Sequence, residues 1–251
     1  MCFGCPARIA DRRHTVFIPI HDDNPLANLT RPWVNYGLIA LTVLAFFVTG
    51  GADTEEIRRA AFSFGLVPSV VNDIRELPAD YVVIPETATY FTYAFLHANF
   101  LHLGGNMLFL WVFGDNIEDA VGHWRYLAFY LLAAAGGGLA HSLMNAGSPL
   151  PLIGASGAVA GIVGAYLLLH PRVKLWVLLL GKIPLRLSAV YVLLAWAAFQ
   201  VANLFIAAPG EENIAWWAHI GGFAAGLVLI IVLRRSGVVL FDRNIAQNPA
   251  A

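Results

Sequence analysis

The chain has 251 residues, of which 59% are hydrophobic and 12% are charged, and its mean hydropathy is +0.67. A soluble domain of this length carries about 25% charged residues, so the composition indicates a protein with several membrane-spanning helices. The net charge of −1 and the lack of a basic run with interleaved aromatic residues argue against a nucleic-acid partner.

The first 33 residues are predicted to form a cytoplasmic tail. Cys2 and Cys5 lie here in a CFGC sequence. A metal or redox site needs a second pair of ligands or a supporting fold, so we interpret this pair as part of an unstructured terminus. Residues 1–15 lack the apolar region of a signal peptide, and we therefore expect the first span to direct insertion.

Apolar stretches of the length that crosses a bilayer, about 20 residues each, follow along the chain. We predict six spans, at residues 34–50, 95–114, 124–146, 153–170, 187–207 and 214–233. Residues 51–94 are too polar to span and are predicted to form an outer, membrane-associated loop. Residues 172–187 carry many cations and are expected at the cytoplasmic surface, or as a short re-entrant piece. The predicted fold class is an all-α membrane protein, a six-transmembrane-helix bundle.

The lysine and arginine residues are distributed unequally between the two sides of these spans. Twelve of the fifteen fall on the side of the N-terminus, and only Arg58, Arg59 and Arg75 fall on the other. The positive-inside rule therefore predicts that both termini, including the tail at 234–251, are cytoplasmic. The pattern favours a bacterial inner membrane and leaves a eukaryotic organelle membrane open.

Unusual polar residues occur near the start of three spans. The second span carries His97, His102 and Asn106, the fourth carries Ser156, and the sixth carries His219. Because these three spans run in the same direction, we expect the five residues to lie at a similar depth near the outer face. Ionisable residues inside a membrane span indicate a functional site.

Small residues at a spacing of four mark faces on which two of these helices can approach closely. They include the pairs Gly157/Gly161 in the fourth span and Gly222/Gly226 in the sixth. Ser156 and His219 lie on or beside these faces, so the serine hydroxyl and the imidazole are predicted to be within hydrogen-bonding reach. That pair is the arrangement of a nucleophile and its base.

A third, acidic member of such a site is not available. Between Asp119 and Glu211 the chain contains no Asp or Glu. We therefore predict a Ser–His dyad rather than a triad. His102 and Asn106 are four residues apart and share a helix face, so they and the Ser156 amide are candidates to stabilise an oxyanion. His97 is expected to supply a further donor or to shape the rim.

Together, GASG at 154–157, the H-x-x-x-N pattern at 102–106 with a histidine five residues earlier, and AHIGG at 218–222 resemble the rhomboid intramembrane serine proteases. The resemblance implies that Ser156 is the nucleophile, His219 the base, and His102 and Asn106 the oxyanion donors. It implies that Gly154 forms the turn before the serine. It also implies that residues 51–94 are the family's first loop, that a mobile cap precedes the last span, and that Glu118 ties helix ends together.

The sequence departs from some bacterial rhomboids in two places. Ala88 and Thr89 stand where those proteins have a Trp-Arg pair, and Ala160 stands where they have a tyrosine that stacks on the catalytic histidine. What holds the ring of His219 is therefore open, although Trp216 and Trp217 are near in sequence.

The preferred function is a serine endopeptidase that cleaves transmembrane proteins near the outer membrane face and needs no cofactor. Its partners are these substrates and the lipid bilayer. A catalytically silent rhomboid-like protein that binds membrane clients is the alternative, and a transporter is a weaker one because no internal repeat is evident.

Zinc binding by His97, His102 and His219 is disfavoured by their spacing. His141 is interpreted as a packed polar residue, and His123 and Arg125 as cytoplasmic rim residues.

Overall fold

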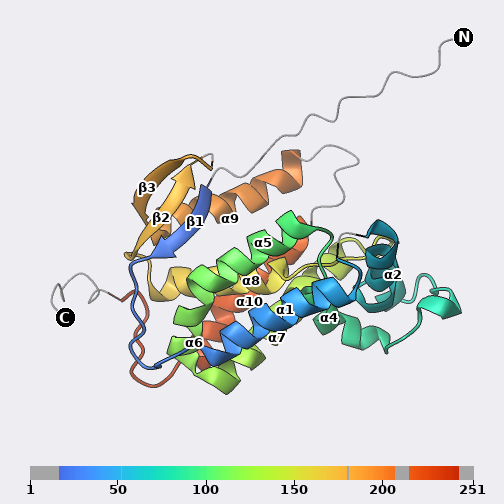
Figure 1. The fold of residues 1–251 in the computed structure, drawn as a ribbon, viewed down its shortest axis with the longest axis horizontal. Helices are drawn as coiled ribbons and strands as arrows, with labels where there is room; N and C mark the ends of the chain where they lie inside the picture. The colour runs from blue at the N-terminus through green and yellow to red at the C-terminus, as the bar shows by residue number, and fades with distance from the viewer. Residues whose placement is uncertain (1–16, 52, 180, 207–214, 243–251) are drawn as a thin grey trace, which may run out of the picture.

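The computed structural model describes residues 17–51, 53–179, 181–206 and 215–242, most of them in helices (Figure 1). The longer helices are α1 (Trp33–Val48), α2 (Thr54–Phe64), α5 (Phe100–Phe109), α6 (Asp115–Val121), α7 (His123–Met144), α8 (Ser156–Leu169), α9 (Ala189–Ile206) and α10 (Trp216–Leu233). The short ones are α3 (Pro68–Val71), α4 (Thr89–Thr92), η1 (Ala79–Tyr81), η2 (Glu86–Ala88), η3 (Tyr93–Phe95) and the π-helix η4 (Leu110–Gly114), which joins α5 to α6.

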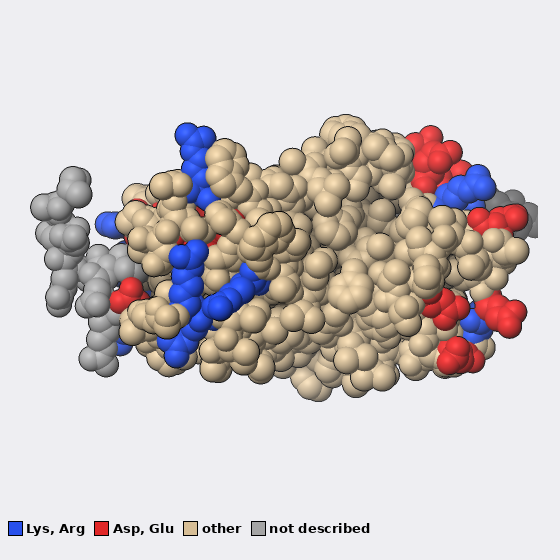
Figure 2. Space-filling view, turned by 90° about the horizontal axis from the view of Figure 1, so that it is seen from below, with Lys and Arg blue, Asp and Glu red and all other residues tan. Residues whose placement is uncertain are grey.

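Five of the six predicted spans each overlap one helix, and the second, predicted at 95–114, is formed by α5 and η4 and begins only at Phe100. Among the described residues, α7, α9 and α10 are long and apolar enough to cross a membrane, whereas α1 and α8 are apolar but shorter. Figure 2 shows one face of the molecule, on which charged residues gather at the two ends and leave a broad band without charge between them. This distribution fits a helical membrane protein with a lipid-facing belt.

Helices α7, α8 and α10 form the centre of the bundle, and α10 packs against both of the others. The close contact between α8 and α10 requires glycine at several positions of these two helices. A Cβ atom at Gly222 would overlap the carbonyl oxygen of Gly157, and one at Gly226 would overlap that of Gly161. The predicted close approach of the two helices is therefore confirmed, and it brings backbone against backbone.

The segment between α1 and α5 forms a separate region at the end of the bundle where α2 lies (Figure 1). Helix α2 begins at Asp53, whose side chain accepts hydrogen bonds from the Glu55 and Glu56 amides. Ile57 and Ala61 face inward while Glu55 pairs with Arg58 on the exposed side. This amphipathic pattern agrees with a loop that packs on the bundle rather than crossing a membrane.

The prediction of an all-α fold is wrong in one part, because the opposite end carries a three-stranded antiparallel sheet. Its order is β1 (Phe17–Asp22), β2 (Lys174–Leu179), β3 (Ile183–Ser188). In β2 the side chains of Lys174 and Trp176 are exposed and those of Leu175 and Val177 are buried. This alternation with a period of two favours a strand, and Lys174–Leu179 pairs with Ile183–Ser188 as a hairpin rather than a re-entrant piece; its place at the cytoplasmic surface stays a prediction.

The region expected to be a tail is partly ordered, since residues 17–29 pack on the sheet and on α6. The carboxylate of Asp119 accepts hydrogen bonds from the amides of Ala27, Asn28 and Leu29. Beside it, the fully buried carboxylate of Glu118 accepts from the amides of Val34 and Asn35 and contacts His123. These contacts join the start of α1 to α6 and α7, so His123 is more than a rim residue.

Candidate active site

A cavity of about 1410 Å³ opens between α5, α9 and the start of α10. Its walls combine apolar side chains with the polar residues that the sequence singled out. The polar and aromatic residues that line the cavity include His102, Asn106, His141, Ser156, Trp196, Gln200, Trp216 and His219. A cavity with a few convergent polar groups is the usual form of an active or binding site.

Ser156 and His219 meet on the wall of this cavity. The Oγ atom of Ser156 lies 2.9 Å from Nε2 of His219, which is hydrogen-bonding distance. The two residues come from α8 and α10, the helices that the glycine contacts hold together. The sequence therefore anticipated both the pair and the packing that brings it together.

The turn before the serine depends on Gly154. This residue has φ = +122°, a conformation that side chains with a Cβ rarely adopt, and a Cβ atom there would lie 2.6 Å from the His102 ring. Ser156 is the first residue of α8. Its N–H therefore belongs to the first turn, whose amides have no acceptor within the helix, and the dipole of α8 favours negative charge at this end.

His102 and Asn106 both line the cavity from α5, one turn apart, as their spacing predicts. In this structure the Asn106 Nδ2 atom donates to the His102 carbonyl oxygen at 3.0 Å, within its own helix. The Asn99 side chain accepts from the His102 amide and begins the helix. Both side chains thus lie on the cavity wall that also carries Ser156, and the side-chain amide of Asn106 is hydrogen-bonded within α5.

His97 does not occupy the position expected for it. It is 1% exposed, so it cannot shape the rim, and its Nε2 atom accepts a 3.3 Å hydrogen bond from the Ala155 amide. Its ring packs against that of His102 at 4.9 Å between centroids. The reason is that α5 begins only at Phe100. His97 therefore precedes the helix, and its ring lies against the backbone just before Ser156.

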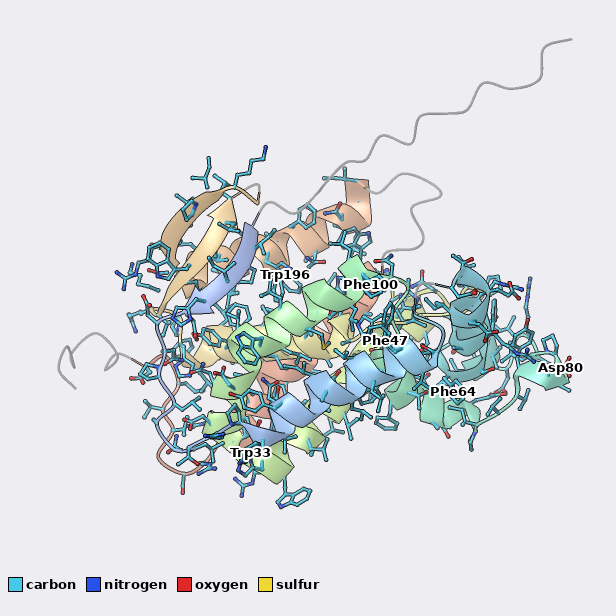
Figure 3. The ribbon with its side chains drawn as sticks, in the orientation of Figure 1. Trp33, Phe47, Phe64, Asp80, Phe100 and Trp196 are labelled. Atoms are coloured by element: carbon cyan, nitrogen blue, oxygen red, sulfur yellow. The ribbon has the colours of Figure 1, made fainter. Side chains whose placement is uncertain are left out.

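Three residues around His219 answer the question left open by Ala160. Gln200 accepts at its Oε1 atom, 2.7 Å from Nδ1 of His219. The ring of Trp196 lies 6.2 Å away, and that of Trp216 meets the imidazole edge-on at 6.1 Å. Figure 3 shows Trp196 on the side of α9 that faces the bundle. Sequence reasoning missed Gln200 and Trp196; the signal was an amide in the interior of an otherwise apolar span.

His141, the two cysteines and the expected cap are the remaining features that the sequence singled out. His141 lines the same cavity, and its buried Nδ1 atom has no hydrogen-bond partner among the described residues; its interpretation as a packed polar residue stays a prediction. Cys2, Cys5 and the expected cap at 207–214 lie outside the described residues. Within the ranges that the structure describes, no group of three or more His, Cys, Asp or Glu residues is arranged to hold a metal ion.

Comparison with known proteins identifies the family. The Rhomboid domain model matches residues 85–236, which include every residue of the cavity described above from Ala98 to His219. This match covers more than half of the chain, and the chain belongs to the Rhomboid family. Membership implies a helical, multi-pass membrane protein.

The chain is similar to named rhomboid proteins from several kingdoms. It is 32% identical to RHOMBOID-like protein 5 of Arabidopsis thaliana over 55% of this chain and 41% of that protein. It is 31% identical to Rhomboid-type serine protease 2 of Emericella nidulans, over 62% and 29% respectively. It is 29% identical to Rhomboid protease GluP of Bacillus subtilis, over 78% and 34%. The chain thus spans less than half the length of these relatives.

Proposed function

We propose that this protein is an intramembrane serine endopeptidase that cleaves transmembrane proteins near the outer membrane face. The observation that supports the proposal most strongly is the 2.9 Å contact between Ser156 Oγ and His219 Nε2 on the wall of a large cavity. Two distant relatives carry the name of rhomboid proteases, which is consistent with it.

In the proposed reaction, Nε2 of His219 takes the proton from the Ser156 hydroxyl as Oγ attacks the carbonyl carbon of the scissile peptide. The carbonyl oxygen becomes an oxyanion, stabilised by the Ser156 amide and by N–H groups of His102 and Asn106. For this step the Asn106 amide must turn from the His102 carbonyl toward the cavity. The imidazolium then protonates the leaving amine, and an acyl-serine ester remains.

Water completes the cycle. His219 takes a proton from a water molecule, whose oxygen attacks the ester carbonyl, and the collapse of the second intermediate returns that proton to Ser156 Oγ. The cavity supplies the space that water needs inside a bundle surrounded by lipid. A substrate helix must unwind locally to be cut, because its own turns shield the peptide bond.

We further propose six membrane spans with both termini in the cytoplasm, on the basis of the charge asymmetry and the six apolar helical segments. In this organisation residues 1–33 and 234–251 flank a catalytic domain at 34–233, and residues 51–94 lie on the outer side. The bacterial inner membrane expected from the sequence stays a prediction.

The test is cleavage of a single-span membrane substrate by purified protein in detergent. Wild type should give a product, while Ser156→Ala and His219→Ala should each give none above background. Equal cleavage by all three proteins would show a contaminating protease and contradict the proposal. If the folded wild type neither cleaves nor reacts with a fluorophosphonate at Ser156, the silent client-binding alternative is favoured.

A further inference from the structure

The side of His219 that faces away from Ser156 is occupied by an amide side chain. Nδ1 of the ring lies 2.7 Å from Oε1 of Gln200, and Nε2 lies 2.9 Å from Ser156 Oγ. Gln200 is only 5% exposed, so this contact is protected from exchange with bulk water. The three residues form a chain of two hydrogen bonds that crosses the imidazole from α9 to α8.

The chemistry of the partners determines where the ring proton lies. An amide oxygen can only accept a hydrogen bond, so Nδ1 of His219 must carry the proton in this contact. In the neutral ring the other nitrogen, Nε2, then has a free lone pair. That lone pair points at the Ser156 hydroxyl, which is the arrangement that a general base requires.

The helix that carries Gln200 is attached to the bundle differently from α8 and α10. Helix α9 follows strand β3 directly and lies at the edge of the bundle in Figure 1. One turn before Gln200 on the same helix, Trp196 places its ring 6.2 Å from that of His219. The two α9 side chains together contact both an edge and a neighbouring face of the imidazole.

We propose that Gln200 is the positioning residue of the site. It fixes the Nδ1–H tautomer and the orientation of His219, the role that a carboxylate has in a Ser–His–Asp triad, without adding a negative charge. This inference rests on the proposed peptidase function. When His219 takes the Ser156 proton, both ring nitrogens carry hydrogen, and Gln200 continues to accept from Nδ1 throughout.

Among the described residues, the titratable groups that interact with His219 include no carboxylate. The other titratable groups that interact with the ring are His102 on α5 and His141 on α7, and both are bases. The indole of Trp216 contacts the ring edge-on from the preceding turn of α10. Among the described residues, Gln200 makes the hydrogen bond that selects between the two tautomers.

The first experiment compares wild type with Gln200→Leu, Gln200→Asn and Gln200→Glu in the cleavage assay. Gln200→Leu removes the acceptor and should lower kcat about 10- to 100-fold with little change in KM, since the contact matters most as the imidazolium forms. Gln200→Asn is one methylene shorter and should be nearly as slow.

Gln200→Glu keeps the acceptor and adds a charge beside the ring. It should recover most of the kcat lost in Gln200→Leu and move the acid limb of the pH–rate profile to higher pH by about one unit, since a nearby carboxylate favours the imidazolium. Recovery of kcat in Gln200→Glu but not in Gln200→Leu distinguishes hydrogen bonding from simple packing, because only the former side chain offers an acceptor oxygen. The matched control is Tyr191→Leu on the same helix, because the Tyr191 side chain is 71% exposed and lies outside the cavity, and it should keep the wild-type kcat.

The second experiment reads the tautomer without relying on catalysis. The ¹⁵N resonances of the His219 ring, assigned by their loss in His219→Ala, should report Nδ1–H in wild type and a mixture of tautomers in Gln200→Leu. If Gln200→Leu does not fold, Gln200→Asn carries the same comparison.

The outcomes separate the two proposals. An unchanged tautomer together with an unchanged pH profile and kcat in Gln200→Leu would overturn the role of Gln200. A tautomer that depends on Gln200 in a wild-type protein that cleaves nothing would support the positioning role and reject the peptidase function. Changes in both, together with wild-type cleavage, support both.

Discussion

The two sides of helix α10 are packed in different ways. Toward α8 the contact is made by backbone atoms, with Gly222 and Gly226 directly against the carbonyl groups of Gly157 and Gly161. Toward α9 the contact at the site is made by side chains, namely the hydrogen bond of Gln200 and the ring of Trp196. The first interface sets the distance between Ser156 and His219, and the second contacts the side of the His219 ring that faces away from Ser156.

We therefore expect the distance from Ser156 to His219 and the orientation of the His219 ring to be controlled by separate parts of the molecule. Backbone contacts in a close-packed interface do not yield to small changes, whereas side-chain contacts can be exchanged one at a time. Changes on the α8 side should therefore damage stability and activity together. Substitutions on the α9 side should lower the cleavage rate more than the stability. Substitutions far from the site should lower the stability more than the cleavage rate.

The largest effect is expected from Gly222→Ala, because the added Cβ overlaps the Gly157 carbonyl oxygen and must force α10 away from α8. A shift of this kind should lower kcat by about 100-fold or more and the free energy of unfolding by about 1–3 kcal/mol. Both are measured by cleavage and denaturation in detergent. Gly37→Ala, in open space on α1, is the matched control and should keep full activity.

Glu118→Gln, far from the cavity, is expected to lower the stability strongly and to leave the cleavage rate nearly unchanged. The buried carboxylate accepts from the Val34 and Asn35 amides, and its loss should cost about 2–3 kcal/mol of unfolding free energy. The kcat of the folded fraction should stay within about twofold of wild type. Glu55→Gln, at an exposed pair with Arg58, should leave the stability close to that of wild type, because water and salt screen such pairs. A large fall in kcat with Glu118→Gln would break the comparison.

The sheet from which α9 emerges should make stability depend on pH through Asp22. Burial raises the pKa of this carboxyl to about 7, despite the hydrogen bond that Tyr166 donates to it. Because the folded pKa lies above the unfolded value, folding is less favourable as pH rises between the two. Between pH 5 and pH 6.5 the wild type should lose about 2 kcal/mol more than Asp22→Asn, at about 1.4 kcal/mol per unit. Parallel pH curves for the two proteins would contradict this assignment.

The smallest of these effects is expected from Trp216→Ala. The indole meets the His219 ring edge-on at 6.1 Å, and such contacts contribute about 0.5–1.5 kcal/mol. Removing it should lower kcat about 2- to 10-fold, and Trp216→Phe should restore most of the loss because an aromatic edge remains. A loss equal to that of Gln200→Leu would mean that ring packing, rather than the hydrogen bond, orients His219.

Much of the site could be predicted because its residues follow rules of spacing. Ser156 and His219 lie beside glycine faces, and His102 and Asn106 share a helix face, so helix periodicity was enough to bring them together. Gln200 belongs to no such pattern, and its contact depends on how α9 is placed, which no spacing within α9 specifies. The sheet was missed although residues 174–177 alternate between exposed and buried side chains, because the apolar composition masked a period of two.

The most direct test of the account is the reaction of the folded protein with a fluorophosphonate, followed by location of the adduct by mass spectrometry. We predict a single adduct on Ser156, absent in Ser156→Ala and strongly reduced in His219→Ala, because the hydroxyl is activated only by the neighbouring imidazole. Unmodified Ser156 in a folded protein, or equal labelling in His219→Ala, would contradict the claim that these two residues form a catalytic dyad.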